Sequence, residues 1–250
     1  MTKKIGIGVQ LYSVRELAAK DLPGVLKAVK QMGYDAVEFA GYHGWSAYDI
    51  RKMLDANGLM VCGTHTGLDQ LMGDSLRRTV DFHRVIGCQY AIVPWIPADQ
   101  RNSIPAVARF ACALNEIAER LAPFGMKTGY HAHGDDFAKL GNRSAWEVLF
   151  GSTSGDVVMQ MDTGNAAEGG ADPVAILKEF PGRSETVHLK ESGGKHGAVI
   201  GEGNVNWKEV LEFCASAGGT KWYVVEHEAQ GVEPMQAIAR SREALRTFGI

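Results

Sequence analysis

The sequence predicts an α/β protein, with one parallel (β/α)8 barrel taking up residues 1–250 as a single domain. Short β-prone runs alternate eight times with amphipathic helical stretches, and 250 residues is about the length that one such barrel needs. Acidic residues and histidines also stand where several of the β-prone runs end. In a parallel barrel these strand ends gather at one face, where barrel enzymes have their active sites.

Four strand–helix units are predicted in the first half of the chain. Their strands are Ile5–Leu11, Ala36–Phe39, Leu59–Gly63 and Tyr90–Val93, and their helices cover residues 21–33, 46–58, 76–86 and 104–121. The first helix is expected to start at Asp21, because an aspartate followed by a proline in the first turn is typical of helix N-termini. Gly33 is expected to end it.

The second half repeats the alternation. Its predicted strands are Met126–His131, Val157–Met161, Thr186–Leu189 and Trp222–Val225, and its predicted helices are Ala145–Phe150, Pro173–Glu179, Trp207–Ala215 and Pro234–Thr247. The alternative α/β fold is a doubly wound open sheet, which favours a glycine fingerprint after the first strand. Gly6 and Gly8 lie inside the first strand and no third glycine follows, so the barrel is favoured.

Composition narrows the classes of function. The net charge is -3 and no basic run occurs, so neither nucleic acid nor an anionic membrane is the expected partner. No apolar run reaches the roughly 18 residues of a membrane helix, and the N-terminal apolar run is too short for a secretory signal. The four cysteines are scattered without a CxxC, which favours reduced thiols in a cytoplasmic enzyme.

Two histidines and two acidic residues end four strands of the second half, and they are the predicted metal ligands: His131, Asp162, His188 and Glu226. Two carboxylates would neutralise a divalent cation and leave positions open for a substrate. Mixed nitrogen and oxygen ligands suit Mn, Co, Fe or Zn better than Mg or Ca, although the sequence does not choose among Mn, Co, Zn, Fe and Mg. His133 shares a strand face with His131 and is an alternative ligand.

Further polar and aromatic residues at strand ends are candidates for substrate contacts: Gln10, Tyr12, Glu38, His65, Trp95, His133 and Lys190. His65 is expected to bind substrate hydroxyls, although it could simply end its strand. Lys190 could stabilise an oxyanion or be a solvated lysine. Tyr12 and Trp95 could form apolar walls for a substrate, although aromatics near strand ends often belong to the core. Without a phosphate-binding loop or an arginine clamp, a phosphorylated substrate is not favoured.

Several motifs together resemble one family over essentially the whole chain. They are Gly8-Val-Gln-Leu-Tyr-Ser-Val-Arg15, Gly33-Tyr-Asp-Ala-Val-Glu38, Gly129-Tyr-His-Ala-His133, Asp162-Thr-Gly-Asn165, His188-Leu-Lys190 and Gly201-Glu-Gly203. The chain resembles the xylose isomerase-like barrel proteins of the sugar phosphate isomerase/epimerase group. That group includes inosose dehydratases and isomerases, hydroxypyruvate isomerases and ketose 3-epimerases.

The resemblance implies a divalent metal held at the positions of His131, Asp162, His188 and Glu226. Two departures stand out: the epimerases carry a glutamate at the position of His131, and many members carry a histidine at that of Asn165. The implied chemistry is removal of a proton next to a carbonyl by Glu226, giving an enediolate that the metal stabilises. His133, Glu38 or Lys190 would then deliver a proton.

The leading hypothesis is therefore a metal-dependent isomerase or epimerase that acts on a non-phosphorylated keto-sugar or inosose. A dehydratase or lyase acting by β-elimination on a keto-sugar, keto-glycoside or inosose is the alternative, because His131 replaces a catalytic glutamate. An endonuclease IV-type nuclease would need a basic groove, which the acidic balance disfavours. A catalytically silent sugar-binding barrel is a third class. The expected partner is a small sugar, and a homo-oligomer is compatible with the sequence.

Overall fold

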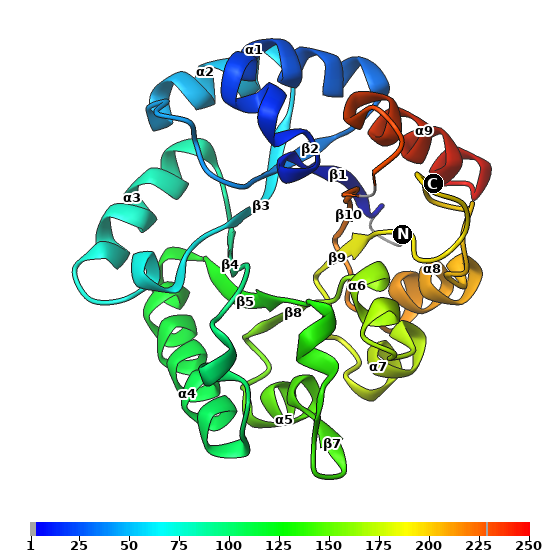
Figure 1. Cartoon of the computed structure of the whole chain (residues 1–250). Coiled ribbons are helices and arrows are strands. Elements are labelled where there is room, and N and C mark those ends of the chain that lie inside the picture. The colour runs from blue at the N-terminus through cyan, green and yellow to red at the C-terminus, as the bar shows by residue number, and fades with distance from the viewer. Residues whose placement is uncertain (1–3, 229) are drawn as a thin grey trace.

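A ring of eight parallel strands lies inside a shell of helices in the computed structural model, which describes residues 4–228 and 230–250 (Figure 1). The strands of the ring are β1 Gly6–Gln10, β2 Ala36–Phe39, β3 Met60–His65, β4 Tyr90–Val93, β5 Lys127–His131, β8 Val158–Gln160, β9 Thr186–Leu189 and β10 Trp222–Val225. All eight predicted strands are present. The predicted (β/α)8 barrel is therefore confirmed.

The helices follow the strands in the predicted order. They are α1 Arg15–Met32, α2 Ala47–Asn57, α3 Ser75–Ile86, α4 Ile104–Leu121, α5 Ala145–Ser152, α6 Thr163–Glu168, α7 Pro173–Glu179, α8 Trp207–Ser216 and α9 Pro234–Thr247. α1 consists of two helical segments that meet at a kink at Asp21 (φ −149°, ψ 71°), so the predicted helix start at Asp21 and end at Gly33 are confirmed, whereas the segment that begins at Arg15 was not predicted. Asp21 still caps the later part, because its carboxylate accepts a hydrogen bond from the Gly24 N–H at 3.0 Å.

The sheet closes between β8 and β9. Along the ring the strand order is β8-β5-β4-β3-β2-β1-β10-β9, and a parallel bridge between Asp162 and His188 joins its two ends. The His188 N–H donates to the Met161 carbonyl at 2.8 Å across this seam. Two of the predicted ligands thus lie side by side because the barrel closes through them.

The amino-terminal end of the barrel interior is filled by Trp222. Its ring packs against two small interior clusters, one of which contains Cys62 and Val224 and the other Tyr90 and Val158. Gly6 leaves room for this ring, since a Cβ there would lie 2.2 Å from a ring carbon. The interior is therefore closed by side chains at the amino-terminal ends of the strands.

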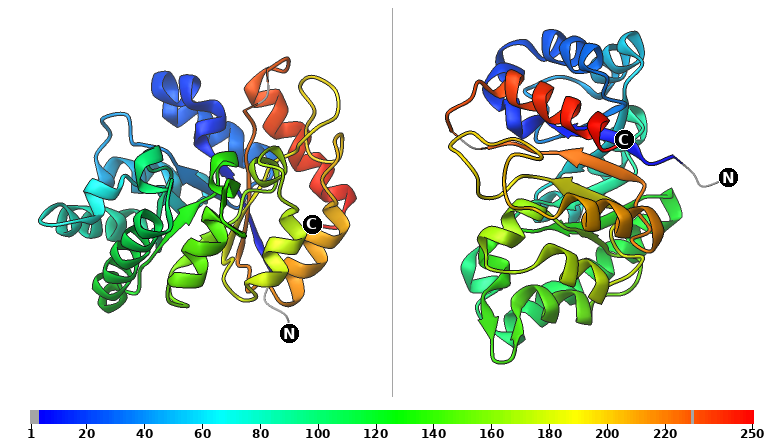
Figure 2. Two further views of the ribbon diagram at one scale, coloured as in Figure 1. Left: turned by 60° about the horizontal axis from the view of Figure 1, so that its bottom comes forward. Right: turned by 90° about the vertical axis from the view of Figure 1, so that its right-hand side faces the viewer.

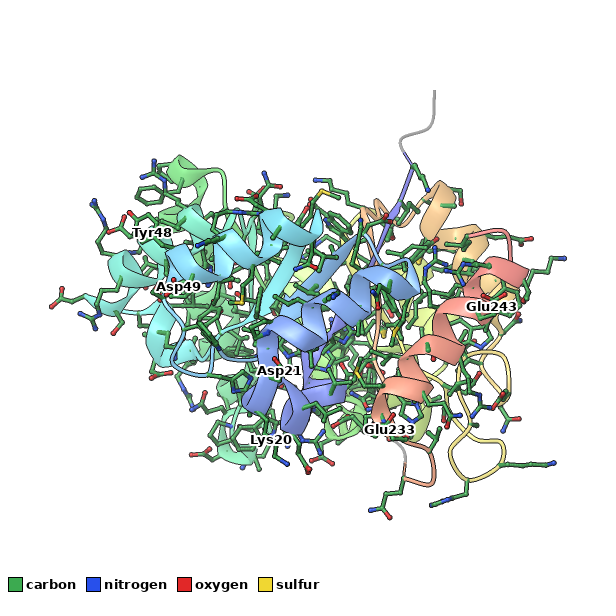
Figure 3. All side chains as sticks on the ribbon, turned by 90° about the horizontal axis from the view of Figure 1, so that it is seen from above. Lys20, Asp21, Tyr48, Asp49, Glu233 and Glu243 are labelled. Atoms are coloured by element: carbon green, nitrogen blue, oxygen red, sulfur yellow. The ribbon has the colours of Figure 1, made fainter. Side chains whose placement is uncertain are left out.

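Polar residues cover the outer helices. Figure 3 shows Lys20 and Asp21 on α1, Tyr48 and Asp49 on α2, and Glu233 and Glu243 at α9, all of them solvent-exposed. The right-hand view of Figure 2 shows the loop between β9 and α8 on the opposite side of the molecule from the start of β1. Within residues 4–228 and 230–250, every helix is too short or too polar to cross a membrane.

Candidate active site

Four buried side chains meet at the carboxyl ends of β5, β8, β9 and β10: His131, Asp162, His188 and Glu226. One potential ligand atom from each lies within 4.8 Å of the others, and none of the four residues is more than 5% exposed. Ligands bound to one cation at about 2.1 Å lie roughly 3–4 Å apart, so small shifts would gather these atoms around an ion. The structure thus brings together all four predicted metal ligands.

His188 lies between two carboxylates. Its Nε2 is 2.5 Å from Glu38 Oε2, and its Nδ1 is 2.5 Å from Glu226 Oε2. Burial alone would lower the pKa of His188, but Glu38 and Glu226 raise it to about 10. Without a cation, His188 is therefore an imidazolium shared by two acids.

Glu38 lies behind this group. It is fully buried and accepts hydrogen bonds from Gln10 Nε2 at 2.8 Å and Gln160 Nε2 at 2.9 Å. Burial would raise the pKa of Glu38, and His188 and His65 hold it below its usual value. A Cβ at position 63 would lie 2.2 Å from Glu38 Oε1, so the glycine there leaves space for this carboxylate.

Two buried polar atoms of the four-residue group have no hydrogen-bond partner among the described residues. They are Asp162 Oδ2 and His131 Nδ1. The other carboxylate oxygen of Asp162 accepts the Asn165 N–H at 2.6 Å and so caps α6. Burying such atoms without a partner is costly, and a cation would provide one. The residues present therefore fit a divalent metal.

The protonation state of His131 suits metal binding, whereas the pKa of Asp162 is raised in the absence of a cation. Burial and the neighbouring His188 hold the pKa of His131 well below its usual value, so its imidazole is neutral and can donate a lone pair. Burial raises the pKa of Asp162 to about 7, with Lys190 opposing and Glu226 reinforcing the shift. A cation at this point would favour the ionised form of Asp162.

A cavity of about 510 Å³ opens above the group. Its lining residues are Tyr12, Ala40, Gly41, His65, Pro94, Trp95, His131, His133, Glu226 and Glu228. Six of the predicted site residues are therefore on its wall. Gln10, Glu38, Asp162, His188 and Lys190 are not.

Lys190 helps to line a second cavity of about 290 Å³, which shares the lining residue Glu228 with the first. Its Nζ is 2.9 Å from Asn165 Oδ1, 2.5 Å from Glu228 Oε2 and 3.6 Å from Glu226 Oε1. Burial would lower the pKa of Lys190, but Asp162, Glu226 and Glu228 raise it above its usual value. Lys190 is thus a fixed cation next to Glu228, which lines both cavities.

Gln160 is a site residue that the sequence analysis missed. It accepts from His65 Nε2 at 2.9 Å, and its amide donates to Glu38 and to Thr186 Oγ1 at 3.0 Å. A glutamine two residues before Asp162, inside the apolar run Val-Val-Met-Gln-Met, was the available signal. Gln10 has a similar place, since its Oε1 accepts the Tyr12 N–H and its amide donates to Glu38.

The barrel and its buried His/Asp/Glu group define a class of α/β barrel proteins whose strand ends could hold a divalent cation. Residues 26–248 match the family described as the xylose isomerase-like TIM barrel, and the chain belongs to this family. The resemblance seen in the sequence motifs is thereby confirmed.

Relatives and solved structures agree with this assignment. Rhizopine catabolism protein MocC of Rhizobium meliloti is 25% identical, with 85% of this chain and 75% of that protein covered. Inosose dehydratase of Geobacillus kaustophilus is 26% identical, with 68% of this chain and 65% of that protein covered. The chain spans about half the length of several other inosose dehydratases. A sugar phosphate isomerase/epimerase structure from Parabacteroides distasonis shares the fold with a TM-score of 0.83 at 23% identity, covering 97% of this chain and 98% of that one.

Proposed function

We propose that this chain is a metal-dependent enzyme that removes the proton next to the carbonyl of an inosose or a related non-phosphorylated keto-sugar and then expels water. One observation carries the proposal. Glu226 belongs to the buried four-residue group and also lines the large cavity, so one carboxylate can reach both a metal and a substrate. The matched inosose dehydratases support the substrate class.

His131, Asp162, His188 and Glu226 would hold the metal in this proposal. When bound, a divalent cation polarises the substrate carbonyl and stabilises the negative charge that develops on its oxygen. Glu38 would accept a hydrogen bond from His188 Nε2 and leave Nδ1 to face the metal. Glu38 was predicted as a catalytic residue, but its full burial behind His188 favours this positioning role.

Glu226 is the proposed general base. Burial would raise its pKa, but His188, His131 and Lys190 hold it well below the usual value, so Glu226 is a carboxylate that can accept a proton. No lysine or arginine is among the residues lining the large cavity in the described chain, which supports a substrate without a phosphate group.

The second half of the reaction separates two candidate functions. Dehydration needs an acid near the leaving hydroxyl. Lys190, whose Nζ lies 3.6 Å from Glu226 Oε1, is a protonated candidate. His133 lies on the cavity wall, but burial lowers its pKa to about 4, so its imidazole is neutral near pH 7 and can donate only a ring N–H. Epimerisation between two carboxylates is less well supported, because Glu38 is buried and Glu228 is paired with Lys190. An isomerase is the second candidate, with His133 returning the proton to a neighbouring carbon.

Product analysis of the Mn²⁺-loaded protein with an inosose in deuterated water tests the proposal. Dehydration gives a product that is lighter by one water, whereas isomerisation gives unchanged mass apart from exchanged hydrogen. Glu226→Gln should lower turnover by about 10²–10⁴-fold, the usual share of a general base. The control Glu233→Gln, at the exposed cap of α9, should keep full activity. Full turnover in Glu226→Gln would rule out the assigned base.

A further inference from the structure

Two separate loops contribute residues to the wall of the large cavity next to the metal group. The loop after β4 carries Trp95, which is 53% exposed, and the segment after β5 carries His133. β4 and β5 are neighbours in the ring (Figure 1). A contact that joins these two loops would fix their positions relative to each other and so the shape of this part of the wall.

Arg101 belongs to the loop after β4 and reaches the segment after β5. Its guanidinium carbon lies 5.8 Å from the centre of the Trp95 ring, within the range of cation–π contacts. Its Nη2 donates to Asp135 Oδ2 at 2.9 Å, and its Nη1 lies 3.6 Å from Asp136 Oδ1. The Arg101 side chain is only 10% exposed, although it stands in a surface loop.

Asp136 connects Arg101 to His133. Its Oδ2 accepts the His133 N–H at 2.8 Å, and its Oδ1 accepts the Tyr130 hydroxyl at 3.1 Å. The Asp136 side chain is 3% exposed, so this carboxylate needs a nearby positive charge, and Arg101 supplies it. Removing Arg101 would leave the carboxylate that fixes the His133 backbone buried and uncompensated.

We infer that Arg101 is a positioning residue, which holds the Trp95 ring against the cavity and, through Asp136, fixes His133. A planar guanidinium can stack on a ring and pair with carboxylates at the same time, whereas a lysine ammonium cannot do both. An effect of Arg101 on substrate binding rests on the proposed function, because it requires a sugar to bind next to Trp95 and His133. The effect of Arg101 on the position of the Trp95 ring does not depend on the proposed function.

Arg183 provides a matched control at the other end of the barrel. Its guanidinium lies 5.6 Å from the Phe150 ring centre, and its Nη2 donates to Thr153 Oγ1 at 2.8 Å. Like Arg101, it joins a loop to an aromatic ring and is partly buried. It precedes β9 and is not among the residues that line the large cavity.

The first test is acrylamide quenching of Trp95 fluorescence, obtained as the difference between each protein and its Trp95→Phe partner. We expect the quenching constant of Trp95 to rise at least about twofold in Arg101→Gln and to stay unchanged in Arg183→Gln. If Arg101→Gln does not fold, Arg101→Lys keeps the charge beside Asp136 and should still show the increase. Unchanged quenching in a folded Arg101 variant would overturn the inference.

The second test uses Mn²⁺ and an inosose. The KM of Arg101→Gln should rise roughly fivefold with Mn²⁺ affinity within about twofold of the parent, because the wall changes and the metal group does not. Arg183→Gln should lower the melting temperature without changing KM. An unchanged KM in Arg101→Gln would refute its role at the cavity. If the parent does not turn over the inosose, the proposed function fails, and the quenching result still decides the role of Arg101.

Discussion

The two ends of the barrel differ in how their carboxylates are paired. At the amino-terminal end, Glu185 accepts hydrogen bonds from Lys127 Nζ at 2.6 Å, from the Tyr90 hydroxyl at 2.7 Å and from Lys221 Nζ at 2.7 Å. The Trp222 side chain fills the barrel interior at this end. The Glu185 carboxylate has all its partners within the chain. Such an arrangement serves stability.

The carboxyl end has more polar groups than the chain can pair. Asp162 Oδ2 and His131 Nδ1 are buried without a hydrogen-bond partner in the part of the chain that the structure describes, and three acids surround His188. Leaving a buried polar atom unpaired costs about 1–3 kcal/mol. The comparison indicates that the polar atoms at the carboxyl end need a partner from outside the chain. A bound cation would be such a partner.

The largest effect should come from removing charge at the unpaired end. In Asp162→Asn we expect Mn²⁺ affinity to fall by more than about 100-fold and turnover to be lost, because even residues that only orient ligands contribute 10–100-fold. The amide oxygen can still accept the Asn165 N–H, so α6 should keep its cap. Elemental analysis of the purified protein measures the metal content.

Asp172→Asn is the control for this substitution. Asp172 also caps a helix, since its Oδ1 accepts the Val174 N–H at 2.9 Å, but it is exposed and is not one of the four gathered residues. Metal content and activity should remain at the level of the parent. If Asp162→Asn keeps its metal as well, Asp162 is not a ligand and the unpaired oxygen needs another explanation.

The sequence predicted most of the barrel, because the apolar β-prone runs have clear ends. Tyr90–Val93, Thr186–Leu189 and Trp222–Val225 match at both ends. The first turns of α1 were missed because residues 15–20 have almost no apolar periodicity, with only Ala18 buried. The helix α6 was missed because it is six small or polar residues whose cap, Asp162, was interpreted only as a ligand. A short hairpin, β6 Lys139–Leu140 and β7 Arg143–Ser144, was also not predicted.

The candidate site could be predicted only where a residue ends a strand. A histidine or an acidic residue at a strand end indicated the four residues that the structure gathers. It could not show which site residues face the cavity and which are buried behind others. Glu38 lies behind His188 because of strand register, which pairs Gln10 with Glu38, and because Gly63 leaves space. The contact of Arg101 with Asp136 joins residues 35 positions apart in different loops, and no local pattern reports it.

An intermediate effect is expected at Glu38. Glu38→Gln keeps the size of the side chain but removes the charge beside His188 Nε2, so we expect Mn²⁺ affinity or turnover to fall by about 10–100-fold. Titration of Mn²⁺ into the metal-free variant measures the affinity, and turnover at saturating Mn²⁺ then measures the effect on catalysis alone. Parent-like values in both measurements would mean that Glu38 does not support the metal group, and the two ends of the barrel would then differ less than the geometry suggests.

The smallest effect is expected from a substitution at the amino-terminal end of the barrel, where Glu185 has all its partners within the chain. Burial would raise the pKa of Glu185, but its bonds from Lys127, Lys221 and Tyr90 lower it. A carboxylate whose pKa is depressed by folding stabilises the protein above its ordinary pKa of about 4.5 and loses that effect as the pH falls through the lowered value. Glu185→Gln should therefore lower the free energy of unfolding in urea by about 1 kcal/mol near pH 7, and by less near pH 3, with Mn²⁺ affinity unchanged. A loss of metal binding in this variant would show that the two ends are coupled, whereas a pH-independent loss of stability would show that the charge of Glu185 contributes nothing.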